Sequence, residues 1–185
     1  TLFLIGDIMT LMGSNDDRLQ KQSIAPSFKL VGTDDKKHSL NELKGEKLTL
    51  VVFMCNHCPY VIPKIEELNR IARDFKDKGL SVIGINPNNN PEYPEDSFEN
   101  MKKLNLSFSY LFDDTQKIAK DYGAVCTPDP FLFDKDLKLV FHSRIDDAHG
   151  SESAQVHELY DAIKEYFESE QISKQENPSM GCSIK

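Results

Sequence analysis

The sequence predicts an α/β fold in which a central mixed sheet is flanked by helices. Two apolar runs, residues 48–54 and 80–85, are separated by a segment whose apolar residues repeat at helical spacing. A strand–helix–strand order of this kind gives a parallel pair with a right-handed crossover. Two later runs, residues 130–133 and 137–141, flank an Asp-Lys-Asp turn and predict an antiparallel hairpin. Parallel and antiparallel strands together make the sheet mixed.

The first third of the chain contains an extension and then the centre of the sheet. Residues 1–22 end in a polar stretch and are expected to form an N-terminal extension. Residues 28–31 predict a short strand, and residues 38–43 predict one helical turn. Residues 48–54 are almost all apolar, which is typical of a strand covered on both faces.

The rest of the chain supplies the helices and the second half of the sheet. A helix follows Cys58 and ends at Gly79. After the second apolar run we expect a turn-rich loop, a helix, a short strand, a second helix, the hairpin and a last amphipathic helix. In order, these elements cover residues 87–94, 96–104, 110–112, 114–123, 130–141 and 156–167. The domain is therefore expected over residues 23–168, followed by a polar C-terminal tail over residues 169–185.

Composition narrows the functional classes. The chain has 185 residues, of which 39% are apolar and 28% charged, enough for one domain with a sizeable core. Its net charge of −8 argues against nucleic acid and anionic membranes as partners. No apolar run is long enough to cross a bilayer. Residues 1–12 lack a preceding basic segment and do not resemble an intact signal peptide, so we expect a cytoplasmic protein.

The sequence Cys55-Asn56-His57-Cys58 predicts reversible disulfide chemistry. It lies between the buried strand and the helix, and unpaired N–H groups at a helix N-terminus stabilise a thiolate. A thiolate is the species that attacks a disulfide. We expect Cys55 to attack and Cys58 to resolve. No metal is expected, because no second pair of ligands follows, and the chemistry requires no organic cofactor.

The two residues between the cysteines are candidates for tuning the redox pair. We expect His57 to be exposed and to stabilise the Cys55 thiolate, which would make the pair more oxidising. Asn56 is a weaker candidate for the same role.

Two prolines point to a known fold. Pro63 lies five residues after the second cysteine, and Thr127-Pro128 comes just before the hairpin. With the order of elements, these features resemble the thioredoxin fold. The sequence is more closely similar to the peroxiredoxin-like, redoxin-domain branch of the alkyl hydroperoxide reductase/thiol-specific antioxidant superfamily. The matching segments are residues 53–61, 84–88, 125–129, 144–147 and 178–185.

The resemblance implies a thiol–disulfide oxidoreductase with a cis Thr127-Pro128 bond opposite the dithiol. Its partners would be protein or small-molecule disulfides and thiols, together with an unidentified dithiol electron donor. One alternative is a thiol-dependent peroxidase, although Val52 stands where peroxiredoxins carry a threonine. A second alternative is a non-catalytic binding module that uses the dithiol structurally.

The two remaining cysteines lead to a separate hypothesis. Cys126 is tied to the Thr127-Pro128 loop and should lie near the dithiol, where it could also be a small buried hydrophobe. Cys182 lies in the tail. We hypothesise that the tail folds back and brings Cys182 within disulfide reach of Cys126, as a structural staple or as a second redox pair.

Overall fold

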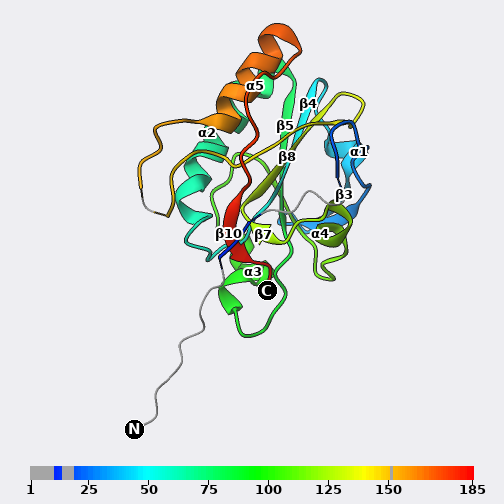
Figure 1. Ribbon diagram of the computed structural model, residues 1–185. Coiled ribbons are helices and arrows are strands. Elements are labelled where there is room, and N and C mark those ends of the chain that lie inside the picture. The colour runs from blue at the N-terminus through cyan, green and yellow to red at the C-terminus, as the bar shows by residue number, and fades with distance from the viewer. Residues whose placement is uncertain (1–10, 14–18, 151) are drawn as a thin grey trace.

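A computed structural model describes residues 11–13, 19–150 and 152–185. It contains a seven-stranded mixed sheet with helices on both faces (Figure 1), which confirms the predicted fold class. Part of the predicted extension, residues 1–10 and 14–18, lies outside the described residues. Among the helices of the described residues, none is long and apolar enough to cross a membrane.

The sheet is built around one fully buried strand. β4 (Leu48–Phe53) pairs in parallel with β5 (Leu80–Asn86) and antiparallel with β8 (Asp129–Asp134), and all six residues of β4 are buried. β8 also pairs antiparallel with β9 (Leu139–His142), as the hairpin prediction required. In spatial order, the strands are β3 (Lys37–Ser39), β2 (Lys29–Gly32), β6 (Ser109–Phe112), β5 (Leu80–Asn86), β4 (Leu48–Phe53), β8 (Asp129–Asp134) and β9 (Leu139–His142).

The helices divide between the two faces of this sheet (Figure 1). Alternate residues of β4 point to opposite faces, so Leu50 and Val52 join one core while Val51 and Phe53 join the other. The first core is covered by α2 (Ile65–Phe75) and α5 (Glu158–Ser169), and the second by α1 (Leu40–Leu43) and α4 (Lys117–Tyr122). A short helix, α3 (Phe98–Met101), packs its Phe98 and Met101 on the first core.

The ends of the helices are set by local sequence. Ser39 and Glu42 form a reciprocal capping box at the start of α1, which satisfies two backbone donors. α2 is preceded by a 3₁₀ turn, Ile62–Lys64, and followed by another, Lys76–Lys78, after which Gly79 adopts a left-handed φ of 103°. Another 3₁₀ turn, Pro94–Asp96, interrupts the loop after β5.

A second, small sheet contains the C-terminal tail. Its strand order is β1 (Leu11–Gly13), β10 (Met180–Ser183) and β7 (Cys126–Thr127), all antiparallel. In Figure 1 the red strand β10 lies beside β7, at the same end of the molecule as α3. The end of the predicted polar tail therefore forms a paired strand, and the tail folds back onto the domain as hypothesised.

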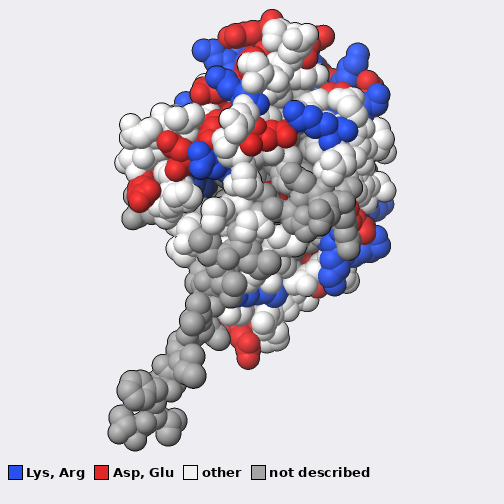
Figure 2. Space-filling model, viewed as in Figure 1, with Lys and Arg blue, Asp and Glu red and all other residues white. Residues whose placement is uncertain are grey.

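Acidic and basic side chains lie side by side on the surface. Figure 2 shows acidic and basic side chains mixed over the end of the molecule that carries α5. The net charge of −8 is thus made up of groups of both signs.

Truncation of the central strand should show how far the fold depends on it. Leu50 is fully buried in β4, and we expect Leu50→Ala to lower the free energy of unfolding by about 2–5 kcal/mol because it leaves a cavity. Urea denaturation followed by circular dichroism would measure the change. Ile24→Ala, at a side chain that is 58% exposed, should change stability by less than about 0.5 kcal/mol.

Candidate active site

The cysteine pair lies in a loop between β4 and the first helical turn. The N–H of Met54 still donates to the Ile85 carbonyl at 2.9 Å, so the strand geometry persists to the residue before Cys55. The helix begins later than predicted, at Ile62. The N–H groups of Val61 and Ile62 both donate to the Cys58 carbonyl, at 2.9 and 3.0 Å. The expectation that a helix N-terminus holds the Cys55 thiolate is therefore wrong.

Three of the four cysteines meet at one point. All four are reduced, and Cys55, Cys58 and Cys126 are fully buried, while Cys182 is 4% exposed. The sulfur of Cys58 lies 2.8 Å from that of Cys182 and 3.5 Å from the Thr127 carbonyl oxygen. The sulfur of Cys55 lies 3.5 Å from the Thr127 hydroxyl. The dithiol therefore faces both the Thr127 loop and the tail.

Hydrogen bonds lower the pKa of Cys58 relative to that of Cys55. The pKa of Cys58 is lowered to about 5, first by its hydrogen bond with the Cys55 side chain and then by those with the Cys182 side chain and the N–H groups of Cys182 and Tyr60, although burial opposes the shift. The pKa of Cys55 is raised because its thiol is the donor to Cys58, because it is buried, and because the Asp96 carboxylate is near. This direction is opposite to the expectation that Cys55 carries the thiolate, and which of the two cysteines attacks stays a prediction.

The Thr127-Pro128 bond is cis, as the resemblance implies. Thr127 is the last residue of β7 and is fully buried, and β8 begins directly after Pro128. The short β7 strand thereby brings the carbonyl and the hydroxyl of Thr127 against the two sulfurs of the pair.

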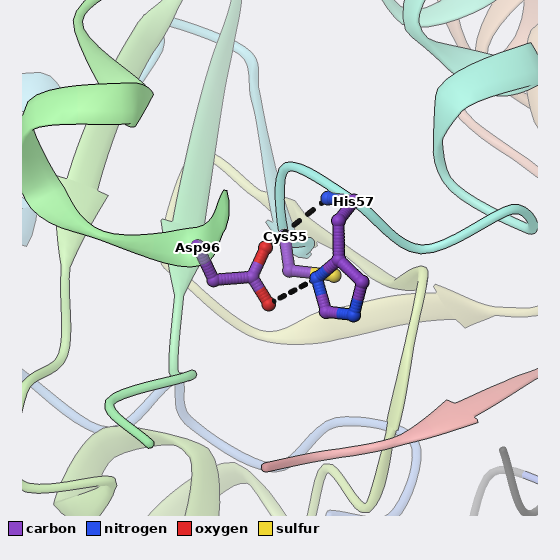
Figure 3. A group of neighbouring side chains, drawn as sticks. All are labelled: Cys55, His57 and Asp96. Atoms are coloured by element: carbon purple, nitrogen blue, oxygen red, sulfur yellow. Dashed lines mark hydrogen bonds and ion pairs between the residues drawn. The ribbon is translucent and has the colours of Figure 1, made fainter. Parts of the chain in front are cut away.

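A buried carboxylate holds the cysteine loop in place. Asp96 is 2% exposed, and one of its oxygens accepts the N–H groups of Asn56 and His57 at 2.7 and 3.1 Å. Its other oxygen lies 2.6 Å from Nδ1 of His57 (Figure 3) and 2.6 Å from the Asn88 amide nitrogen. The sequence predicts only that a helix begins at about Asp96, and it misses the contact with the cysteine loop because Asp96 lies about forty residues further along the chain.

The predicted tuning residues take different roles. The His57 side chain is only 18% exposed, and its ring stacks on Tyr93 with centroids 5.3 Å apart, so the expectation of an exposed residue is wrong. Asn56 anchors the loop, since its amide donates to the Glu95 carbonyl at 2.9 Å and accepts from the Tyr110 hydroxyl at 2.9 Å. An effect of His57 on the reduction potential stays a prediction.

The trio in Figure 3 is also the group of side chains that could hold a metal. The ligand atoms of Cys55, His57 and Asp96 all lie within 4.8 Å of one another. A structural zinc site uses four ligands. Both oxygens of Asp96 already accept hydrogen bonds from the loop, the N–H groups on one side and the Asn88 amide on the other. These contacts favour an electrostatic role for the trio beside the dithiol.

The tail cysteine pairs with a different partner from the one hypothesised. In the β10–β7 register Cys182 lies opposite Thr127, and Ser183 lies opposite Cys126. Adjacent residues of a strand point to opposite faces, so Cys126 and Cys182 face away from each other. The tail does fold back, but it presents Cys182 to Cys58. Cys126 is a small buried residue whose pKa is raised by burial and by the neighbouring Asp129.

A buried ion pair fixes the beginning of the helical segment. Lys64, in the 3₁₀ turn before α2, pairs with Asp146, and its ammonium group also donates to the Ala148 carbonyl at 2.9 Å. Asp146 in turn accepts the Ala148 N–H at 2.9 Å. The segment after β9 is thus tied to the turn that follows the cysteine loop.

Comparison with known proteins places the chain in a family. Residues 22–142, more than half of the chain, match the AhpC/TSA family. The chain belongs to the AhpC/TSA family. Among relatives, the thiol-disulfide oxidoreductase ResA of Bacillus thuringiensis (strain Al Hakam) is 30% identical over 129 residues, 69% of this chain and 71% of that protein.

Two further comparisons extend the resemblance. Peroxiredoxin Q, chloroplastic, of Oryza sativa subsp. japonica is 28% identical over 106 residues, 57% of this chain and 47% of that protein. The crystal structure of an uncharacterized conserved protein from Geobacillus kaustophilus is 38% identical, with a TM-score of 0.89 over 96% of each chain. This AhpC/TSA protein is therefore a peroxiredoxin-like member with a thioredoxin-like fold, and the family supports oxidoreductase chemistry on thiols.

The charge on Cys58 leads to a pH dependence that can be measured. The pKa of Cys58 lies about 5, below its ordinary value of 9.0, so the reduced protein should show one thiolate at neutral pH that titrates near pH 5. Thiolate ultraviolet absorbance would follow the titration. Cys58→Ser should remove it, and Cys126→Ser should leave it unchanged.

The lowered pKa of Cys58 also determines how the stability of the folded protein changes with pH. The pKa of Cys58 is lower in the folded protein than its ordinary value of 9.0. The stabilisation that comes from ionised Cys58 is therefore complete above pH 9.0 and is lost as the pH falls towards 5. The difference in unfolding free energy between the reduced protein and Cys58→Ser should therefore shrink with falling pH. A thiolate that persists in Cys58→Ser would contradict the assignment.

Proposed function

We propose that this AhpC/TSA protein is a thiol–disulfide oxidoreductase in which Cys58 attacks and Cys55 resolves. The observation that carries the proposal is the place of Cys58, whose sulfur lies against the cis-proline loop, 3.5 Å from the Thr127 carbonyl oxygen. Hydrogen bonds that lower the pKa of Cys58 below that of Cys55 support it. A thiolate at neutral pH is the reactive species for disulfide exchange. Protein or small-molecule disulfides are the expected substrate class.

The first step forms a mixed disulfide. The Cys58 thiolate attacks one sulfur of the substrate, the substrate S–S bond breaks, and the leaving sulfur departs as a thiolate and takes up a proton. In the second step Cys55 loses its proton and attacks the Cys58 sulfur. The second substrate sulfur then leaves, and the protein keeps a Cys55–Cys58 disulfide. Another dithiol must reduce this bond before the next turnover.

The second step needs a proton acceptor, because the pKa of Cys55 is raised. His57 is a candidate, since a ring nitrogen of His57, like an oxygen of Asp96, lies within 4.8 Å of the Cys55 sulfur. Asp96 holds the ring through the 2.6 Å contact to Nδ1 and would stabilise the imidazolium that forms (Figure 3). We assign His57 as the base and Asp96 as a positioning residue.

The similarity to peroxiredoxin Q favours a second candidate function. As a peroxidase, the protein would use the Cys58 thiolate to attack hydrogen peroxide, which breaks the O–O bond and gives a sulfenic acid and a hydroxide that takes up a proton from solvent. The Cys55 thiol would then attack the sulfenic acid, form the disulfide and release water. Single-turnover kinetics with hydrogen peroxide would separate the two functions. A reaction no faster than that of an ordinary thiol supports the oxidoreductase, and a reaction orders of magnitude faster supports the peroxidase.

Cysteine variants test the assignment of roles. We expect Cys58→Ser to abolish reduction of insulin disulfides because the attacking sulfur is gone. A chain with both Cys55→Ser and Cys182→Ser should retain substrate on Cys58 as a stable mixed disulfide, which mass spectrometry would detect. Cys126→Ser should keep normal turnover. Substrate trapped on Cys55 in the Cys58→Ser protein would reverse the roles.

The role of His57 predicts a specific pH profile. In His57→Asn the resolution step should slow by about 100-fold at neutral pH, the scale of a lost general base, and recover as rising pH ionises Cys55. Stopped-flow measurement of the release of the second thiol would show this. His38→Asn is the matched control, because His38 also lies against a carboxylate, 2.9 Å from Asp34, but on the edge strand β3. An equal slowing at every pH would indicate a structural role instead.

A further inference from the structure

The dithiol has a third sulfur beside it. The sulfurs of Cys58 and Cys182 are 2.8 Å apart, closer than either sulfur of the pair lies to Thr127 and approaching the disulfide bond length of about 2.05 Å. The N–H of Cys182 also donates to the Cys58 sulfur. Cys182 is therefore aimed at the reactive atom of the site.

The strand that carries Cys182 fits closely against the cis-proline loop. β10 lies between β7 and β1, and Cys182 is in register with Thr127. A Cβ atom on Gly181 would lie 1.9 Å from the Thr127 carbonyl oxygen, which is too close for any side chain. The glycine before Cys182 thus allows the tail to reach the dithiol.

The end of the tail is fixed by polar contacts. The N–H of Ile184 donates to the Val125 carbonyl at 3.2 Å, and the Lys185 N–H donates to the Asn88 side-chain oxygen at 2.8 Å. The Gln116 amide donates to the Lys185 carbonyl at 2.7 Å. Asn88 also donates to Asp96, so the tail shares the network that holds the cysteine loop.

The beginning of the tail segment is fixed as well. The Asn177 carbonyl accepts the Arg144 N–H at 2.8 Å and the Ser143 hydroxyl at 3.0 Å. The Asn177 amide donates to Glu158 at 3.1 Å. Because both ends are held, Cys182 reacts with Cys58 as an oriented intramolecular partner, which greatly favours exchange.

We propose that Cys182 is a third redox-active cysteine, which forms a disulfide with Cys58 in alternation with the Cys55–Cys58 bond. The proposal rests on the proposed function in one respect, since Cys58 is taken as the sulfur that receives oxidising equivalents. Its consequence is that Cys182 can resolve a mixed disulfide on Cys58 without Cys55. Once formed, the bond also holds β10 over the buried pair.

The step is an intramolecular exchange and needs no added oxidant. The Cys182 thiolate attacks the Cys58 sulfur of the Cys55–Cys58 disulfide, the Cys58–Cys182 bond forms, and the Cys55–Cys58 bond breaks. Cys55 leaves as a thiolate and takes up the proton that Cys182 lost. On a mixed disulfide the same attack releases the substrate thiol. One disulfide per chain is present before and after the exchange.

Disulfide mapping in a glutathione buffer tests the proposal directly. The full chain carrying Cys55→Ser is equilibrated with oxidised and reduced glutathione, quenched with acid, digested without reduction and analysed by mass spectrometry. We expect a Cys58–Cys182 peptide as the main disulfide. Cys126→Ser in the same background should leave it in place. Glutathione retained on Cys58 together with a free Cys182 thiol would overturn the proposal.

A second pair of variants keeps the cysteines intact. Gly181→Ala forces β10 away from Thr127, and should slow formation of the Cys58–Cys182 bond at least tenfold in the otherwise unaltered chain. Gly13→Ala is the matched control, since a Cβ on Gly13 in the neighbouring strand meets only the Ser179 carbonyl, at 3.9 Å. Equal rates in the two variants would overturn the proposal.

The mapping distinguishes this proposal from the proposed function. It detects a bond and requires no turnover. If the Cys58–Cys182 disulfide forms in a protein that does not reduce insulin, the redox role of Cys182 is supported and the oxidoreductase activity is contradicted. If insulin is reduced at a normal rate and this bond is absent, the oxidoreductase activity is supported and the redox role of Cys182 is contradicted.

Discussion

The site depends on the hydrogen bonds that surround the buried sulfur of Cys58. A buried thiolate is stable only when donors surround it, because burial alone raises the pKa of a thiol. Here the donors are the thiols of Cys55 and Cys182 and the N–H groups of Tyr60 and Cys182, which come from the cysteine loop and from the last strand of the chain. The Cys58 sulfur is thus contacted by segments from two distant parts of the sequence.

Asp96 has the complementary role on the other side of the loop. Its carboxylate accepts two backbone N–H groups and the Asn88 amide, and it lies against the His57 ring. The same charge raises the pKa of Cys55. One carboxylate therefore fixes the shape of the loop and helps to keep the two thiols in different protonation states, which is the asymmetry that disulfide exchange requires.

Close fit around the dithiol also restricts access. Cys55 and Cys58 are fully buried, and β10 pairs with β7 directly beside them. The β10–β7 contacts that assemble the site therefore also enclose the Cys58 sulfur.

The sequence by itself determined the elements that depend on local apolar patterning. The spacing of apolar residues predicts the strands β4 and β5, the helix between them and the β8–β9 hairpin. Burial of apolar side chains is the main driving force for folding, so buried positions recur with the period of each element. The cysteine pair and the cis Thr127-Pro128 bond were also identified from the sequence, the second through family resemblance.

Tertiary structure alone decided which polar groups meet. Asp96 reaches the loop across about forty residues, and the tail brings Cys182 to Cys58 across more than one hundred. Strands β7 and β10 have only two and four residues, too few to show a period of two. The charge on Cys58 depends on donors from both segments. Such contacts depend on strand register and loop geometry, which local sequence patterns do not predict.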